Sequence, residues 1–190
     1  MNKEVLKKSL DWVEKVGVKH PPLFLHVFGE PLLFKEFEDY AKEFSKLVSV
    51  SFSTNCTYID SKRADRLAEI DWAWISLSPW KMEDVERSYR LLDERGIKIM
   101  YPRGVTHDWA SQAEGPIIGS TFKCHFLVEK EAVIRWDGSI ANCCISDREE
   151  DKIGHVDQNP SEINMRLYSI CKSCHHWIPS ETLRELEEVQ

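Results

Sequence analysis

The chain has 190 residues, a net charge of −7, 42% hydrophobic residues and 30% charged residues, which is typical of a soluble globular protein. Its length allows one domain, or one domain with an appendage. The acidic balance argues against a general nucleic-acid binder, which normally has a basic excess. No apolar run approaches the length of a membrane span, and the N-terminus lacks the apolar core of a signal peptide. We therefore expect a cytoplasmic protein with neither nucleic acid nor membrane as a partner.

Helical and strand patterns alternate through the first part of the chain. Apolar residues at helical spacing predict an opening helix that ends before His20-Pro21-Pro22, and Asp60 or Ser61 can cap a later one. Gly96 is well placed to end the last helix of this region. The alternation indicates βαβ units and a parallel sheet. The expected helices begin near residues 2, 33, 60 and 82, and the expected strands span 23–28, 48–54, 74–77 and 97–101.

Polar loops follow three of these strands, at 29–31, 54–55 and 76–80. Right-handed crossovers put the carboxyl ends of parallel strands on one edge of the sheet, where such folds place their binding sites. We therefore expect the three loops to share that edge. The glycine-containing segment 102–123 is typical of a linker, so we expect one domain over 1–110 and a second over 111–190.

Cysteines dominate the second part. Six cysteines in a reducing compartment suggest metal ligation rather than disulfides. Four of them form a spaced pattern: Cys124, thirteen residues, Gly138, four residues, Cys143, and later Cys171-Lys-Ser-Cys174. Residues 132–144, AVIRWDGSIANCC, predict a hairpin with an Asp-Gly turn that returns Cys143 towards Cys124. A Cys-x-x-Cys loop turns two sulfurs towards one metal, so a thiolate cluster is the natural use of this arrangement.

This spacing resembles the auxiliary-cluster domain of radical SAM enzymes, in the short twitch form rather than the seven-cysteine SPASM form. The resemblance implies that Cys124, Cys143, Cys171 and Cys174 hold one [4Fe–4S] cluster with no open iron. A cluster with full thiolate ligation suits electron transfer or structural support. Zinc on the same four thiolates is the main alternative, and four buried apolar cysteines are a second one. Cys171 to His175 also matches the c-type haem attachment motif.

Three segments of the first part carry the same resemblance. FGEPLL at 28–33 is similar to the GGEPLL loop, which contacts the amino group of S-adenosylmethionine in that family. FSTNCTYID at 52–60 resembles the TNGT segment, with Cys56 where glycine is usual. WISLSPW at 74–80 resembles the fourth strand, whose small polar residue lies near the methionine or ribose. The resemblance implies an S-adenosylmethionine site made by Gly29, Glu30, Pro31, Thr54, Asn55 and Ser76.

One part of the family pattern is absent, namely the Cys-x3-Cys-x2-Cys loop after the first strand. Residues 1–22 contain no cysteine, so we expect the first strand and its loop to be missing through truncation, a natural split or degeneration. An N-terminal radical SAM fragment or a full-length radical SAM protein would then be the partner. With that piece supplied, the resemblance implies hydrogen-atom abstraction by a 5′-deoxyadenosyl radical; alone, the chain is not expected to cleave S-adenosylmethionine.

The expected architecture is therefore α/β: a partial (β/α) radical-SAM-type barrel followed by a small β-hairpin/α iron–sulfur domain. The expected function is that of an iron–sulfur protein or subunit of the radical SAM family. The alternative is a non-catalytic partner or interaction module with a structural four-cysteine zinc site. No residue selects a substrate.

Overall fold

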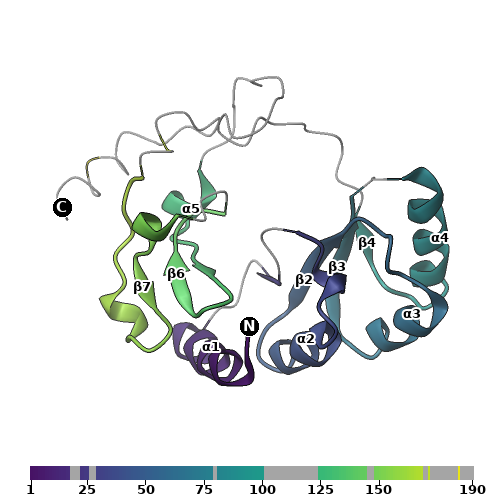
Figure 1. The fold of residues 1–190 in the computed structure, drawn as a ribbon, viewed down its shortest axis with the longest axis horizontal. Helices are drawn as coiled ribbons and strands as arrows, with labels where there is room; N and C mark the ends of the chain where they lie inside the picture. Colours follow the sequence, from purple (N-terminus) through teal and green to yellow (C-terminus); the bar gives the residue numbers. More distant parts are fainter. Residues whose placement is uncertain are drawn as a thin grey trace. The chain divides into compact units, whose positions relative to one another are not determined.

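The computed structural model describes residues 1–17, 22–25, 29–78, 81–100, 124–144, 148–168, 171 and 184. The chain forms two compact units, shown in Figure 1. One is Val16–Gly104, here called the sheet unit, and the other combines Met1–Lys15 with Val105–Gln190, here called the cysteine unit. The expected domain boundary at 110–111 and the expected linker at 102–123 lie outside the described residues. Among the described helices, none is both long and apolar enough to cross a membrane.

The sheet unit is built on a four-stranded parallel sheet in the order β1-β2-β3-β4, as the alternating pattern predicts. Consecutive strands pair side by side, so each crossover adds one strand to the growing edge. The strands are β1 (Leu23–Phe24), β2 (Val50–Thr54), β3 (Trp72–Leu77) and β4 (Ile99–Met100). The helices are the 3-10 turn η1 (Pro31–Leu33), α2 (Phe37–Ser45), α3 (Ser61–Leu67) and α4 (Met82–Asp93), with the α-helices on one side of the sheet in Figure 1.

An aromatic cluster joins α2 to the sheet. The Phe37 ring meets the Phe52 ring edge-on with centroids 4.8 Å apart, and Phe52 lies 4.9 Å from Trp72. Phe52 and Ile75, neighbours in the β2–β3 register, are both fully buried on this face. Burying one aromatic side chain contributes about 2 kcal/mol, so this core anchors the strand ends that carry the site.

Several element boundaries differ from the sequence prediction, and local hydrogen bonds explain the main difference. The helix expected from residue 33 begins only at Phe37, because the Glu30 side chain accepts the Leu32 amide and starts the separate turn η1. The predicted cap of α3 is confirmed, since the Asp60 carboxylate accepts the Arg63 amide at 2.7 Å. Gly96 adopts φ +70° just beyond α4, where the Ile97 amide bonds back to the Leu92 carbonyl.

The cysteine unit contains a three-stranded antiparallel sheet in the order β5-β6-β7. The strands are β5 (Val133–Ile134), β6 (Ser139–Ala141) and β7 (Gly154–His155), so the predicted hairpin is confirmed. Its β6 strand ends at Ala141, earlier than expected, so Cys143 and Cys144 follow the strand instead of lying on it. The other elements are α1 (Lys3–Val16), α5 (His125–Val128), and the 3-10 turns η2 (Glu149–Asp151) and η3 (Pro160–Glu162).

Polar contacts fix the tip of the hairpin. Gly138 has φ +90°, and a Cβ atom there would lie 2.8 Å from the His155 ring, so glycine is required on both counts. Asp137 accepts from the Ser139 amide and hydroxyl, and its other oxygen lies 3.1 Å from Lys152 Nζ. Burial alone would raise the pKa of Asp137, but the Ser139 bonds and the Lys152 ammonium lower it to about 2.

Candidate functional site

The Glu30 carboxylate ties together two of the loops that were expected to share one edge. Its Oε1 atom accepts from the Leu32 amide at 3.0 Å and from the Thr54 hydroxyl at 2.9 Å. Its Oε2 atom accepts from the Asn55 amide at 2.7 Å. We call this set of contacts the Glu30 bridge. It brings three of the predicted residues, Glu30, Thr54 and Asn55, to the carboxyl end of the parallel sheet.

The contacts of the Glu30 bridge determine which polar groups at this edge of the sheet can still bind a ligand. Since both Glu30 oxygens already accept from the protein, this side chain holds the two loops in register. The Asn55 side chain accepts the Thr57 amide through Oδ1, and its Nδ2 amide has no protein partner among the described residues. Gly29 has φ +80°, a conformation that turns the backbone at the start of the loop, and Pro31 begins η1. Among the described residues of these two loops, the Asn55 Nδ2 amide is therefore available to a ligand.

Cys56 directly follows Asn55 in the loop after β2. It is fully buried and has φ +71°, a left-handed conformation that is uncommon for a residue with a Cβ. Its amide donates to the Thr54 hydroxyl at 3.1 Å, and its carbonyl accepts from the Ser88 hydroxyl at 3.2 Å. Burial raises the pKa of the Cys56 thiol to about 11. The thiol thus stays protonated at neutral pH, and the residue serves to hold the loop.

Ser76 lies on the face of the parallel sheet opposite to Phe52 and Thr54. It pairs with Ser53 in the β2–β3 register, one residue before the Thr54–Leu77 pair, and successive residues of a strand point to opposite faces. Ser51 shares the face of Ser53, and its buried hydroxyl has no partner among the described residues. The face opposite the Phe37–Phe52 contact therefore carries serine hydroxyls. The structure does not bring Ser76 into the Glu30 bridge.

In the cysteine unit, three cysteines gather around Tyr168. Cys143, Cys144 and Cys171 pack against this buried residue, together with Ile153. The Tyr168 amide lies 3.4 Å from the Cys171 sulfur and donates to it. The Tyr168 hydroxyl accepts the Asn142 amide at 3.0 Å, and burial raises the pKa of Tyr168 to about 12. The two predicted ligands Cys143 and Cys171 therefore share one buried neighbour.

Of the other two predicted ligands, one is described and is not among the residues that pack against Tyr168. Cys124 precedes α5, and its carbonyl accepts the Val128 amide at 3.0 Å. Cys174 lies outside the described residues, as do the neighbouring His175 and His176. In the part of the chain that the structure describes, no three histidine, cysteine or acidic side chains are positioned together to hold a metal ion. A four-cysteine ligand set remains a prediction.

Sequence reasoning missed two groups that organise these sites. Tyr168, at the centre of the cysteines, carries no signal beyond lying three residues before Cys171. Glu38, buried in α2, binds both Arg63 at 2.8 Å and Arg66 at 3.1 Å on α3. Two basic residues one helical turn apart on α3 are a visible signal, but nothing in the pattern identifies their acidic partner.

The fold is similar to that of solved structures of BtrN, a radical SAM enzyme. BtrN in complex with AdoMet and 2-DOIA has a TM-score of 0.66 and 16% identity, over 85% of this chain and 68% of that chain. Selenomethionine BtrN in an open conformation has a TM-score of 0.57 and 16% identity, over 85% of this chain and 66% of that one. No protein-family model matches the sequence, and a comparison with curated proteins found no match. The chain therefore has a radical SAM-like α/β fold.

Proposed function

We propose that this chain is an iron–sulfur protein of the radical SAM family. It binds S-adenosylmethionine at the carboxyl edge of its parallel sheet and one auxiliary [4Fe–4S] cluster in its cysteine unit. The Glu30 bridge carries the first half of this proposal. Two segments that resemble the family's S-adenosylmethionine motifs lie far apart in sequence, and the bridge joins them at one point of a BtrN-like fold.

At the sheet edge, each proposed residue has a role that its surroundings suit. S-adenosylmethionine presents an ammonium and a carboxylate, which need acceptors and donors respectively. Backbone carbonyls of the Gly29–Pro31 loop suit the ammonium, and the Asn55 Nδ2 amide suits the carboxylate. Glu30 and Thr54 act as positioning residues, because their side chains are engaged with each other. Ser76, on the opposite sheet face, would contact another part of the ligand.

In the cysteine unit, the donor set fits a cluster of soft metal ions. Cys124, Cys143, Cys171 and Cys174 would be the ligands, and such a cluster supplies one-electron transfer when it is bound. Cys143 and Cys171 share the buried Tyr168, and an N–H donor already points at the Cys171 sulfur. N–H···S bonds stabilise thiolate ligands and tune the potential of a cluster. Tyr168 and Ile153 would exclude water from the sulfurs, which leaves electron transfer or structural support as the role.

The proposal includes a partner. Reductive cleavage of S-adenosylmethionine in this family needs a cluster with an open iron, and the six cysteines of the sequence contain no Cys-x3-Cys-x2-Cys motif. We therefore propose that this sequence does not cleave S-adenosylmethionine by itself. A polypeptide that carries that motif would supply the missing cluster.

Calorimetric titration of S-adenosylmethionine into the protein tests the sheet-edge site. We expect binding by the wild type and about tenfold weaker binding by Asn55→Ala, since one hydrogen bond to a charged group contributes about 1.5–3 kcal/mol. The matched control is Asn2→Ala, because the Asn2 side chain also accepts a backbone amide, that of Val5, but Asn2 precedes α1 and belongs to the cysteine unit. Wild-type protein that takes up iron but binds no S-adenosylmethionine would contradict the site and leave the cluster standing.

A further inference from the structure

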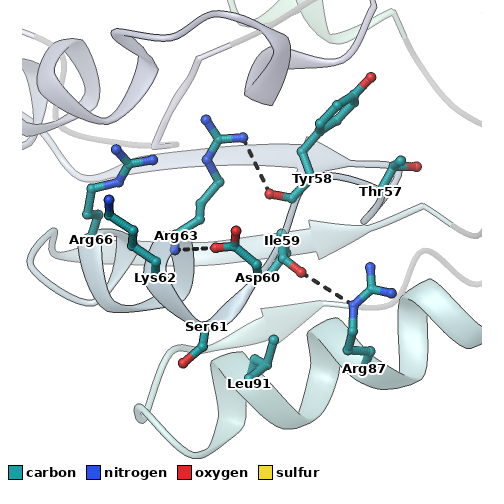
Figure 2. Close-up of a pocket in the computed structure, with 10 residues that line it drawn as sticks. All are labelled: Thr57, Tyr58, Ile59, Asp60, Ser61, Lys62, Arg63, Arg66, Arg87 and Leu91. Atoms are coloured by element: carbon teal, nitrogen blue, oxygen red, sulfur yellow. Dashed lines mark hydrogen bonds between the residues drawn. The ribbon is translucent and has the colours of Figure 1, made fainter.

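A hollow in the sheet unit is lined by residues 57–60, by α3 and by α4 (Figure 2). It has a volume of about 770 Å³ and opens to solvent, so it is a groove. Residues 57–63, Arg66, Arg87 and Leu91 line it, and we call it the basic groove. No described residue that lines it belongs to the proposed S-adenosylmethionine site. The basic groove is therefore distinct from the proposed S-adenosylmethionine site.

The basic groove concentrates positive charge on an acidic protein. Four of its lining residues are basic, namely Lys62, Arg63, Arg66 and Arg87, whereas Asp60 is the one acidic residue among those described. The whole chain has a net charge of −7. Asp60 is committed to the fold, since its Oδ1 atom caps α3 through the Arg63 amide at 2.7 Å. An anionic ligand is repelled by most of this protein's surface and attracted here.

The carboxylates that pair with these basic side chains lie deeper than the basic groups do. Glu38 is shared by Arg63 and Arg66, and its side chain is only 7% exposed, whereas that of Arg66 is 47% exposed. Asp84 is 17% exposed and its partner Arg87 is 44% exposed. Solvent therefore meets the guanidinium groups of Arg66 and Arg87, whereas Arg63 is only 14% exposed. One carboxylate shared by two guanidinium groups also leaves a positive charge without a counterion.

Backbone contacts hold two of the cations in place. Arg63 donates to the Leu32 carbonyl at 2.8 Å and to the Tyr58 carbonyl at 3.4 Å. Arg87 donates to the Ile59 carbonyl at 3.4 Å, as Figure 2 shows. Together with the ion pairs to Glu38 and Asp84, these bonds fix the positions of both guanidinium groups. Fixed donors lose less side-chain entropy when a ligand binds.

Lys62 places a positive charge at the N-terminus of α3, where a negative charge is favoured. It is the second residue of α3, where the partial positive charge of a helix N-terminus favours an acidic residue, and the first turn of α3 contains none. Lys62 is exposed, and no partner of its ammonium lies among the described residues. Lys62 therefore does not stabilise its own helix and has no described internal partner. Its ammonium is available to bind an external anion.

Apolar groups line the same groove. Tyr58 is 42% exposed and the half-buried Leu91 also contributes to the wall, whereas Ile59 is buried. A small inorganic anion would leave these groups unused. An open groove with spaced cations and apolar groups fits an extended polypeptide that alternates carboxylates with apolar side chains. We infer that the basic groove binds an acidic, partly hydrophobic segment of another protein.

Fluorescence anisotropy with a labelled peptide, Glu-Glu-Leu-Glu-Glu-Leu, tests this inference. We expect saturable binding that weakens as salt rises from about 50 to about 300 mM, because the contacts are ionic and exposed. Lys62→Glu should weaken binding about fivefold or more, and Lys62→Glu with Arg66→Gln about tenfold or more. Lys62→Glu is expected to fold at least as well as the wild type, since it places an acidic residue in the first turn of α3.

Lys98→Glu is the matched control, with the same change in net charge. Lys98 is exposed and precedes β4, at the amino end of the sheet and away from the carboxyl end where the 57–60 loop begins. We expect less than a twofold change in peptide affinity. Absence of binding, an equal loss in Lys98→Glu, equal binding of a peptide with lysine in place of glutamate, or displacement by about 5 mM inorganic phosphate would each overturn the inference.

Discussion

The two units of this chain stabilise their candidate sites in different ways. The sheet unit has a large apolar core with many fully buried side chains, including Phe52, Ile75, Leu77 and Leu92. The described strands of the cysteine unit have only two or three residues each. Among its described residues, Ile140 and Ala141 are fully buried, and Val13, Leu127 and Tyr168 are nearly so. Ionic and polar contacts such as Asp137–Lys152 and Lys8–Asp157 supplement this small core. A metal held by the cysteines of this unit would add to its stability.

With the proposed cluster in the cysteine unit, this comparison predicts its largest effect from removal of that cluster. Iron chelation, or Cys171→Ala, should unfold the cysteine unit while the sheet unit stays folded, because a structural metal site contributes about 10 kcal/mol to folding. Hydrogen exchange resolved by region would show loss of protection in β5, β6 and β7 but not in β2 and β3. Cys56→Ser is the control, since Cys56 belongs to the sheet unit. Equal loss of protection in both units would contradict the comparison.

The Glu30 bridge should give the next largest effect, confined to the sheet unit. Glu30→Ala leaves the Asn55 amide and the Thr54 hydroxyl without their acceptor, so we expect a loss of about 2–3 kcal/mol in the free energy of unfolding. Urea denaturation measures this. Glu36→Ala is the control, because the Glu36 side chain makes no capping bond to α2 and is exposed. Similar stability losses in both variants would show that the bridge is not structural.

The stability of the cysteine unit is expected to depend on pH through Asp137. The folded pKa of Asp137, about 2, lies below its ordinary value of 3.8, so its charge stabilises the fold above pH 4 and this contribution is lost as pH falls towards 2. The Asp137 side chain is 32% exposed, and solvent screening reduces the contribution to about 1 kcal/mol. Asp137→Asn should lower stability by that amount at pH 7 and remove the corresponding loss between pH 4 and 2. An unchanged acid profile would exclude this role.

The smallest effect is expected at Cys56. Cys56→Gly relieves a left-handed backbone conformation by about 1 kcal/mol but removes a buried side chain of similar value, so stability should stay within about 1 kcal/mol of the wild type. Cys56→Val should lose about 2 kcal/mol or more, because a β-branched residue is strained at φ +71°. Thermal unfolding compares the two. A valine variant as stable as the glycine variant would mean that the loop adjusts freely.

The sequence predicts the larger pattern well where periodicity and turn chemistry agree. The parallel order of β1 to β4, the Asp60 cap and the Asp-Gly hairpin all follow from local signals. The ends of the elements were harder to predict, because side-chain contacts determine them. For example, Glu30 accepts the Leu32 amide, so the turn η1 forms separately from α2. Long-range partners were not predictable at all. The Glu38 pairing with α3 and the packing of α1 residues with the cysteine unit depend on tertiary contacts between distant segments.

The most direct test of the central claim is the iron and sulfide content of protein purified and reconstituted without oxygen, read with its absorbance spectrum. We expect about four irons and four sulfides per chain, with broad brown absorbance that Cys171→Ala removes and Cys56→Ser keeps. A colourless protein with one zinc per chain would contradict the iron–sulfur proposal. It would leave a structural four-cysteine metal site beside a radical SAM-like sheet.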